Sequence, residues 1–159
     1  MSKVLVTGGG GFVGKALSLS LLAQGHEVWS VSRGSYPELE HAGIRTLRAD
    51  LSGPTKSFAE AFRGAQVVFH TAAKVEMWGC YEDFFRVNVI GTRNVINLCR
   101  EEGVPALVYT SSPSVIADGT DLMGINEDYP YPRKYKAHYP RTKALAEQGI
   151  RILGVGDLY

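Results

Sequence analysis

Tyr139 and Lys143, a tyrosine and a lysine four residues apart, are the pair in this sequence best suited to proton transfer. On a helix this spacing puts both side chains on one face. A neighbouring ammonium favours the phenolate form, which makes the tyrosine a better proton carrier near neutral pH. The same spacing is common on solvated helix faces, so its meaning depends on the groups that the fold brings beside it.

Glycine is concentrated at the start of the chain, where five of the first fourteen residues are glycine. Their spacing fits both Gly9-x-Gly11-x-x-Gly14 and Gly8-x-x-Gly11-x-x-Gly14, between an apolar run at 3–7 and an amphipathic stretch from residue 13. A strand-to-helix turn without side chains lets a pyrophosphate approach the backbone amides and the helix N-terminus. The alternative is a tight turn without a ligand, but the strand before it and the helix after it favour a dinucleotide.

The position that reads the ribose lies about 20 residues further on, where folds that bind NAD usually carry Asp or Glu. Here the residues are Val31-Ser-Arg-Gly34, and Arg33 can pair with a 2′-phosphate, helped by Ser32 or Ser35. We therefore expect NADP, with NAD as the alternative and an ordinary surface arginine as the simpler interpretation.

Asp50 and Leu51 end the third strand-like segment. The Asp50 carboxylate could accept a hydrogen bond from the adenine amino group, and capping a loop is an equally good role for it.

Polar and small side chains follow two further strand-like segments. Thr71, Ala72 and Ala73 come after 66–70, and Ser111 and Ser112 come after 106–110. Ligands collect at the carboxyl ends of strands in parallel sheets, and small side chains there leave room for the nicotinamide half of a cofactor. Asn88 lies within a long helical pattern, where it could hold a backbone carbonyl or a water in a proton relay or simply be exposed.

Apolar strand-like and amphipathic helical segments alternate along the chain, which predicts an α/β fold with a doubly wound parallel sheet. The expected strands are 3–7, 27–31, 43–48, 66–70 and 106–110. The expected helices are one from about residue 13 that stops at Gly25, 54–62, 82–102 and about 140–149.

The composition is that of a soluble globular protein, with 45% hydrophobic residues and a net charge of +1. The charge disfavours nucleic acid as a partner, no apolar run is long enough for a membrane span, and the N-terminus lacks a secretory signal. Two cysteines, Cys80 and Cys99, form no zinc or disulfide pattern, so we expect a cytoplasmic protein without a metal. His70 and His138 have no partners at metal-ligand spacing and are expected to be structural.

In combination these motifs resemble the extended short-chain dehydrogenase/reductase superfamily, which includes the NAD-dependent epimerases and dehydratases. The resemblance covers residues 3 to about 148. The matching runs are Thr7-Gly-Gly-Gly-Gly-Phe-Val-Gly14, Asp50-Leu51, His70-Thr-Ala-Ala73, Asn88-Val-Ile-Gly-Thr92, Tyr109-Thr-Ser-Ser112 and Tyr139-Pro-Arg-Thr-Lys143. Within it, Tyr109-Thr-Ser-Ser-Pro-Ser-Val115 and the run Tyr139 to Glu147 are similar to the 3β-hydroxysteroid and sterol 4α-carboxylate dehydrogenases and to the 2-alkyl-3-oxoalkanoate reductases.

The resemblance implies a three-layer Rossmann fold and a role for each matching residue. Tyr139 would be the general acid/base, Lys143 would assist it and hold the nicotinamide ribose, and Ser112 would polarise the substrate oxygen, with Ser111 as the alternative serine. Asn88 would support the proton relay. The cofactor would be held by Gly8, Gly11, Phe12, Val13, Gly14, Arg33, Asp50, Leu51, Thr71, Ala72 and Ala73 together with Tyr139 and Lys143.

The implied reaction interconverts a hydroxyl and a ketone on a hydrophobic small molecule, such as a sterol or a 2-alkyl-3-oxoalkanoate. A nucleotide-sugar epimerase or dehydratase and a non-catalytic dinucleotide-binding fragment are the alternatives. The aromatic run Trp78, Tyr81, Phe84 and Phe85 could floor the substrate pocket or belong to the core or to a dimer interface. The resemblance also implies a homodimer.

Members of this superfamily continue well beyond the Tyr-Lys helix into a small substrate domain. We therefore expect residues 1–148 to form the cofactor-binding domain with the catalytic helix, and residues 149–159 to form an atypical tail, in which Ile150 to Val155 could make one short strand. Most of the C-terminal substrate domain is expected to be missing from this chain.

Overall fold

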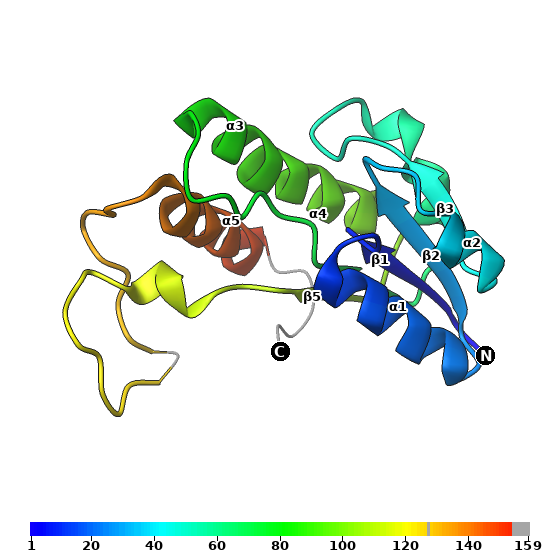
Figure 1. Cartoon of the computed structure of the whole chain (residues 1–159), viewed down its shortest axis with the longest axis horizontal. Helices are drawn as coiled ribbons and strands as arrows, with labels where there is room; N and C mark the ends of the chain where they lie inside the picture. The colour runs from blue at the N-terminus through cyan, green and yellow to red at the C-terminus, as the bar shows by residue number, and fades with distance from the viewer. Residues whose placement is uncertain (127, 154–159) are drawn as a thin grey trace.

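A single parallel sheet lies at the centre of the computed structural model, which describes residues 1–126 and 128–153 (Figure 1). Its strands run in the order β3-β2-β1-β4-β5, and every neighbouring pair is parallel. The bounds are β1 (Lys3–Thr7), β2 (Glu27–Ser32), β3 (Arg45–Arg48), β4 (Val67–His70) and β5 (Ala106–Tyr109). The predicted doubly wound sheet is confirmed. Because sheet growth reverses after β3, the carboxyl ends of β1 and β4 flank a topological switch point, where such folds bind ligands.

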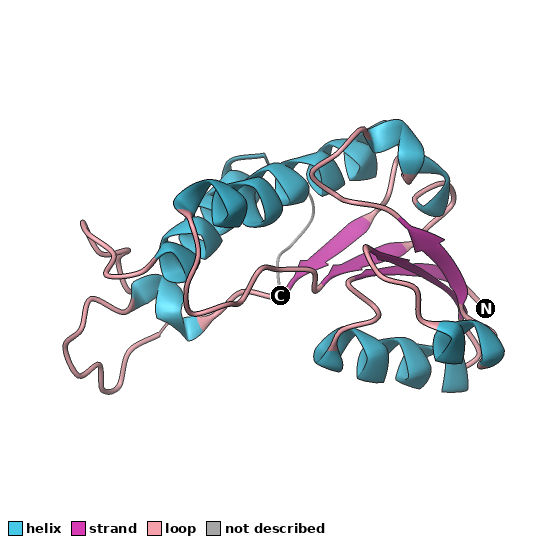
Figure 2. Ribbon diagram, turned by 45° about the horizontal axis from the view of Figure 1, so that its top comes forward, coloured by secondary structure: helices cyan, strands magenta, loops and turns pink. Residues whose placement is uncertain are grey.

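Helices cover both faces of the sheet and complete a three-layer architecture (Figure 2). One face carries α1 (Phe12–Ala23) and the short α2 (Pro37–His41). The opposite face carries α3 (Tyr81–Phe85), α4 (Gly91–Glu101) and α5 (His138–Leu153).

Alternation along β1 separates the two cores, because successive strand residues point to opposite faces. Val4 and Val6 pack with Leu21 and Leu39 of the α1–α2 layer. Leu5 packs in the larger core on the other face, whose members from the helical layer include Ile96. The strands are therefore buried on both sides, as expected for a parallel sheet.

Three secondary-structure predictions need correction. The segment 54–62 forms two separate 3-10 turns, Thr55–Ser57 and Ala59–Ala61, because Phe58 has a φ of −140° that interrupts the helix and lets its ring enter the core. The expected helix 82–102 begins at Tyr81 and contains a π-helical turn, Arg86–Ile90, between α3 and α4. The prediction of a short strand within 150–155 is wrong for residues 150–153, because α5 continues to Leu153 and buries Ile150.

No helix within the described ranges is both long and apolar enough to cross a membrane. The cytoplasmic location and the domain boundary at residue 148 stay predictions. Residues 154–159 of the expected tail lie outside the described residues.

The close approach of α1 to the first turn gives a testable prediction about Gly14. A Cβ added at Gly14 would lie 2.2 Å from the carbonyl oxygen of Gly8 and 2.8 Å from Oγ1 of Thr71. Gly14→Ala should therefore lower the free energy of unfolding by about 1–3 kcal/mol, as overpacking does. Urea denaturation measures the loss.

Gly149→Ala is the matched control, since Gly149 also lies in a helix but a Cβ there meets no atom within 4 Å. That variant should be neutral or slightly stabilising, because alanine is the better helix former. Equal effects of the two substitutions would contradict the packing described for Gly14.

Candidate active site

The glycine loop closes tightly over the end of β1. The amide of Gly8, at φ +73°, donates to the carbonyl of Val31 (2.7 Å), and the amide of Gly11 donates to the carbonyl of Gly8 (2.9 Å). A Cβ at Gly8 would lie 2.8 Å from Cα of Ala72, so this residue must be glycine for the loop to rest against the segment after β4. Phe12 and Val13 begin α1 with exposed side chains.

A pocket opens beside this loop at the carboxyl edge of the sheet. It brings together six of the predicted cofactor-binding residues from four separate segments: Gly8, Arg33, Asp50, Leu51, Ala72 and Ala73. Thr71 does not line this pocket. Its hydroxyl donates to the carbonyl of Thr7 (2.7 Å), at the end of β1 just before the glycine loop. Gly11, Phe12, Val13 and Gly14 do not line this pocket and lie along the start of α1.

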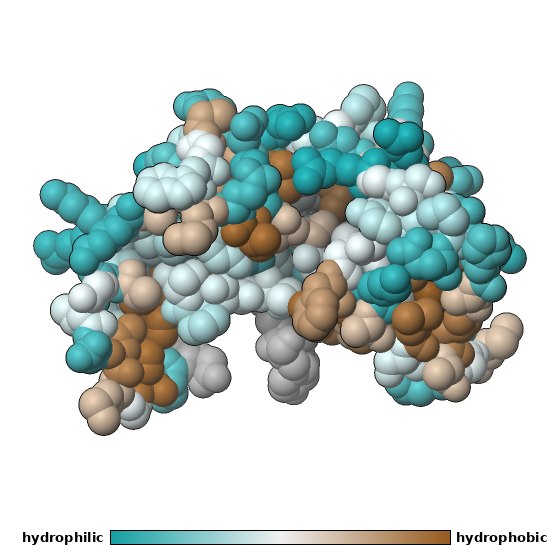
Figure 3. All heavy atoms as spheres, viewed as in Figure 1, coloured by the Kyte–Doolittle hydropathy of each residue, from teal (hydrophilic) through white to brown (hydrophobic). Residues whose placement is uncertain are grey.

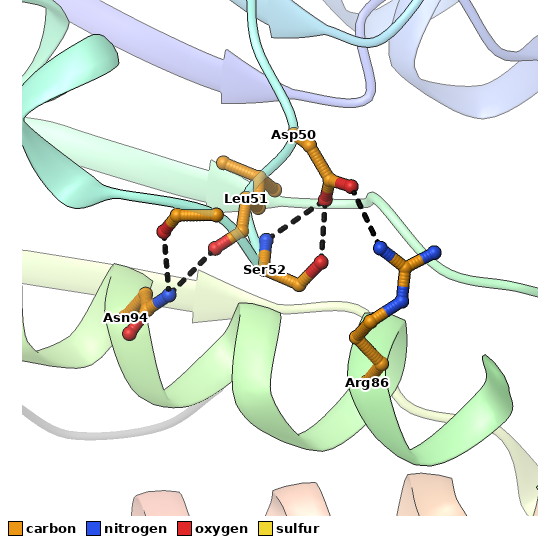
Figure 4. Close-up of polar contacts among 6 residues, drawn as sticks. Asp50, Leu51, Ser52, Arg86 and Asn94 are labelled. Atoms are coloured by element: carbon orange, nitrogen blue, oxygen red, sulfur yellow. Dashed lines mark hydrogen bonds and ion pairs between the residues drawn. The ribbon is translucent and has the colours of Figure 1, made fainter. Parts of the chain in front are cut away.

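Asp50 caps the loop that follows β3, as one of its two predicted roles requires (Figure 4). Its Oδ1 accepts from the amide (2.9 Å) and the hydroxyl (2.6 Å) of Ser52, and its Oδ2 accepts from Arg86 (3.2 Å). Partial burial raises the pKa of Asp50, but the hydrogen bonds from Ser52 and the charges of Arg86 and Arg33 outweigh it, so the net pKa is lowered. Asp50 is therefore an anionic anchor that also lines the cofactor pocket.

Asn94 of α4 holds the same loop from below. Its amide donates to the carbonyls of Leu51 (2.8 Å) and Gly53 (3.3 Å) (Figure 4). These hydrogen bonds attach the loop that lines the pocket to α4, and no sequence motif predicted them.

Lys143 is buried to 2% exposure, and its ammonium donates a 2.6 Å hydrogen bond to the carbonyl of Thr110, just after β5. Its Nζ lies 4.0 Å from the centre of the Tyr109 ring. Burial lowers the pKa of Lys143 to about 8, against the opposing charge of Glu147. Tyr139 lies one turn earlier on α5 and is half-buried. The helix α5 therefore places the ammonium of Lys143 at the carboxyl end of β5 and carries Tyr139 one turn earlier.

The two serines after β5 have different partners. Ser112 caps a 3-10 turn, Pro113–Ile116, and its hydroxyl lies 2.8 Å from that of Ser114. Ser111 instead donates to the carboxylate of Glu147, which also accepts from Tyr131 (2.7 Å). Sequence reasoning missed Glu147, although it follows Lys143 by four residues and thus continues the Tyr139–Lys143 helix face.

Apolar side chains gather over the loop that follows β5 (Figure 3). A hollow of about 420 Å³ lies there, lined by Ser111, Ser112, Pro113, Val115, Ile116, Ile125, Asn126 and Glu147. The aromatic run at 78–85, which could have formed the floor of a substrate pocket, does not form one surface. Phe84 is buried to 1% exposure, whereas Trp78 is 84% exposed. Phe84 thus follows the core alternative.

Asn88 is buried at the π-helical turn and joins three segments. Its Oδ1 accepts from the amide of Lys74 (2.7 Å), and its Nδ2 donates to the carbonyl of Lys74 (3.1 Å) and to the hydroxyl of Thr142 (3.0 Å). Thr142 in turn donates to the carbonyls of His138 (2.9 Å) and Tyr139 (3.1 Å). The exposed-residue interpretation of Asn88 is wrong, because its amide links the segment after β4 to the backbone of the Tyr-Lys helix.

His70 is buried between two threonines. The hydroxyl of Thr92 donates to the carbonyl of Asn88 (2.6 Å), so Nε2 of His70 donates to Thr92 (2.9 Å) and Nδ1 accepts from Thr7 (2.6 Å). Burial, aided by the charge of Lys143, lowers the pKa of His70 to about 3, so the ring is neutral. It bridges β1, β4 and α4 as a structural group.

Comparisons with known proteins identify the family of this chain. Residues 5–152 match the model of the 3-beta hydroxysteroid dehydrogenase/isomerase family. The chain belongs to this family. It is 45% identical over 157 residues to 2-alkyl-3-oxoalkanoate reductase of Stenotrophomonas maltophilia, covering 98% of this chain and 47% of that protein. It is 38% identical over 154 residues to the human decarboxylating sterol-4-alpha-carboxylate 3-dehydrogenase, covering 96% of this chain and 39% of that protein.

Among solved structures, a short-chain dehydrogenase/reductase superfamily protein of Agrobacterium tumefaciens with bound NAD is similar, with a TM-score of 0.85 and 26% identity. The match covers 98% of this chain and 47% of that one. The Rossmann fold expected from the motifs is confirmed. The chain spans 39–47% of the length of these three proteins.

The buried ammonium of Lys143 gives a testable pH dependence. The folded pKa of about 8 lies below the ordinary lysine value of 10.5, so between these values the unfolded chain binds more protons. The wild type should therefore gain stability with rising pH over this window, relative to Lys143→Met, by on the order of 3 kcal/mol.

Below pH 8 the difference between the two proteins should be constant, because the ammonium is charged in both the folded and the unfolded state. Urea denaturation of both proteins at several values between pH 7 and 10.5 measures it. Parallel stability curves across the whole range would contradict the burial of a charged Lys143.

Proposed function

We propose that this chain binds NADP and carries the proton-transfer residues of an oxidoreductase that interconverts a hydroxyl and a ketone on a hydrophobic β-hydroxy or β-keto compound. The observation that carries this proposal is the position of Lys143. Its buried ammonium lies at the carboxyl end of β5, on the helix that bears Tyr139 and beside the turn that bears Ser112.

The residues present fit a nicotinamide dinucleotide. The glycine loop leaves bare backbone at the N-terminus of α1, and α1 has no acidic residue in its first turn, so an anion there meets amides and a favourable dipole. The pocket between Gly8, Asp50 and Ala72 would hold the adenosine half. When bound, the nicotinamide would supply or accept the hydride.

NADP rather than NAD is proposed from the carboxyl end of β2. Ser32 and Arg33 line the pocket where folds that bind NAD place a carboxylate. Ser32 already accepts from the amide of Gly10 (3.2 Å), which sets its hydroxyl against the glycine loop. A guanidinium and a hydroxyl suit a phosphate, whereas the guanidinium cannot accept a hydrogen bond from a ribose 2′-hydroxyl as a carboxylate would.

In the reductive direction Tyr139 gives its phenolic proton to the substrate oxygen, which Ser112 has already hydrogen-bonded. Lys143 would stabilise the phenolate left behind and would hold the nicotinamide ribose. Asn88 fixes the start of α5 through Thr142, so we assign it a positioning role in the proton relay.

The apolar hollow beside Ser112 supports a hydrophobic substrate, as do the relatives named 2-alkyl-3-oxoalkanoate reductase and sterol dehydrogenase. A UDP-galactose 4-epimerase is also similar in structure, with a TM-score of 0.82 and 31% identity. A sugar dehydratase would need acidic residues next to the catalytic serine, and Pro113 and Ser114 stand there instead.

A homodimer through α4 and α5 is part of the proposal. Leu145 is 37% exposed at the groove between these helices, where Arg93 also lies. An apolar side chain at such a groove suits contact with a second helix pair.

Tyr139→Phe tests the proton-transfer role. This variant should lose turnover of a 2-alkyl-3-oxoalkanoate, followed by NADPH oxidation, because no other group replaces the phenolic proton. Its affinity for NADPH should stay within about threefold of the wild type, because only one hydrogen bond is removed. Tyr81→Phe, which also removes one hydroxyl, should keep activity.

Surviving turnover in Tyr139→Phe would remove this residue from the acid role. NADPH binding without turnover in the wild type would instead favour a dinucleotide-binding unit without catalysis, and turnover of a UDP-sugar alone would favour an epimerase.

Arg33→Asp tests the choice of cofactor. The carboxylate repels a 2′-phosphate and accepts from a ribose 2′-hydroxyl, so the ratio of NADH to NADPH affinity should rise by about tenfold or more. Titration of both cofactors by intrinsic fluorescence measures it. An unchanged ratio would remove Arg33 from the 2′-phosphate site.

A further inference from the structure

Arg48, the last residue of β3, lies next to the proposed 2′-phosphate site, although it belongs to no recognised motif. Its Cα pairs with that of Ser32 in the parallel register of β2 and β3. Paired residues of neighbouring strands project to the same face of a sheet. Since the Ser32 hydroxyl meets the amide of Gly10, Arg48 projects toward the glycine-loop side as well.

The guanidinium of Arg48 is held in place by the backbone that carries Arg33. Its Nε donates to the carbonyl of Arg33 (3.0 Å). This bond uses one donor and leaves the two terminal amino groups of the guanidinium for another acceptor. It also restricts the side chain before any ligand arrives, which reduces the entropy that binding would cost.

The two arginines form a concentration of positive charge. Both are exposed, and neither Arg33 nor Arg48 takes part in an ion pair within 4.0 Å among the described residues, whereas Arg45, Arg63 and Arg86 each have a carboxylate partner. Asp50 is the carboxylate whose pKa responds to Arg33, and its oxygens are already engaged by Ser52 and Arg86. An incoming dianion would therefore find two cations with little competition.

We propose that Arg48 is a specificity-determining residue that binds the 2′-phosphate of NADP together with Arg33 and Ser32. This inference rests on the proposed function, since it concerns the same cofactor. A phosphate monoester carries nearly two negative charges at neutral pH and offers three acceptor oxygens, so a second planar fork adds both charge and hydrogen bonds. NAD carries no group at this position, and its affinity should not depend on Arg48.

The test compares NADPH with NADH, and 2′-phospho-AMP with AMP, in titrations of the full chain by calorimetry at fixed ionic strength. Arg48→Gln should weaken NADPH and 2′-phospho-AMP by about tenfold and leave NADH and AMP within about twofold. Arg48→Lys should recover part of the loss, because it restores the charge but not the fork.

Arg45→Gln is the matched control from the other end of β3, where Arg45 pairs with Glu27 (3.6 Å) and lies over the ring of Trp29. It should change none of the four affinities. The double variant Arg33→Gln/Arg48→Gln should show non-additive losses for NADPH, because both side chains bind one phosphate.

Two results would overturn the inference while leaving the proposed function intact. The first is loss of NADPH preference in Arg33→Gln but not in Arg48→Gln. The second is an equal loss of NADPH and NADH affinity in Arg48→Gln, which would indicate that this side chain only supports the Arg33 backbone. A wild type that binds NADH as tightly as NADPH would overturn the proposed cofactor and this inference together.

Discussion

One buried amide connects the segment after β4 to the helix that carries Tyr139 and Lys143. Asn88 holds both backbone groups of Lys74 after β4 and the hydroxyl of Thr142 on α5. Asn88 lies in the π-helical turn Arg86–Ile90, where its side chain is buried. A buried amide with all its partners satisfied is stable, whereas removal of one partner is costly, so the segments it joins must keep their relative placement.

Lys143 depends on that placement. An isolated ammonium is expensive to bury, and here the cost is offset by the carbonyl of Thr110, the face of the Tyr109 ring and the charge of Glu147. The same strand end carries Ser111 and Ser112, with Ser111 bound to Glu147. At this strand end Lys143 packs against Tyr109 and Thr110, whereas Ser111, Ser112 and Glu147 line the apolar hollow.

Sequence patterns predicted the features that depend on interactions between residues close together in the chain. The glycine spacing, the alternation of strands and helices, and the Tyr139–Lys143 pair all follow from backbone geometry over a few residues. The sequence could not predict the interruption of 54–62 at Phe58, the π-helical turn, or the contact between Arg48 and Arg33, because each depends on packing between distant segments. Glu147 was within reach of the i to i+4 rule, but its partner Ser111 lies 36 residues away.

The central claim is that the buried ammonium and the phenol on α5 meet the cofactor that the glycine loop holds. A crystal structure of the chain with NADPH tests it through the distances from Lys143 Nζ and the Tyr139 hydroxyl to the hydroxyls of the nicotinamide ribose. Both distances should be hydrogen-bond distances of about 3 Å. The claim would be contradicted if Lys143 still bonded only to the carbonyl of Thr110 while the ribose lay beyond hydrogen-bond reach of both side chains.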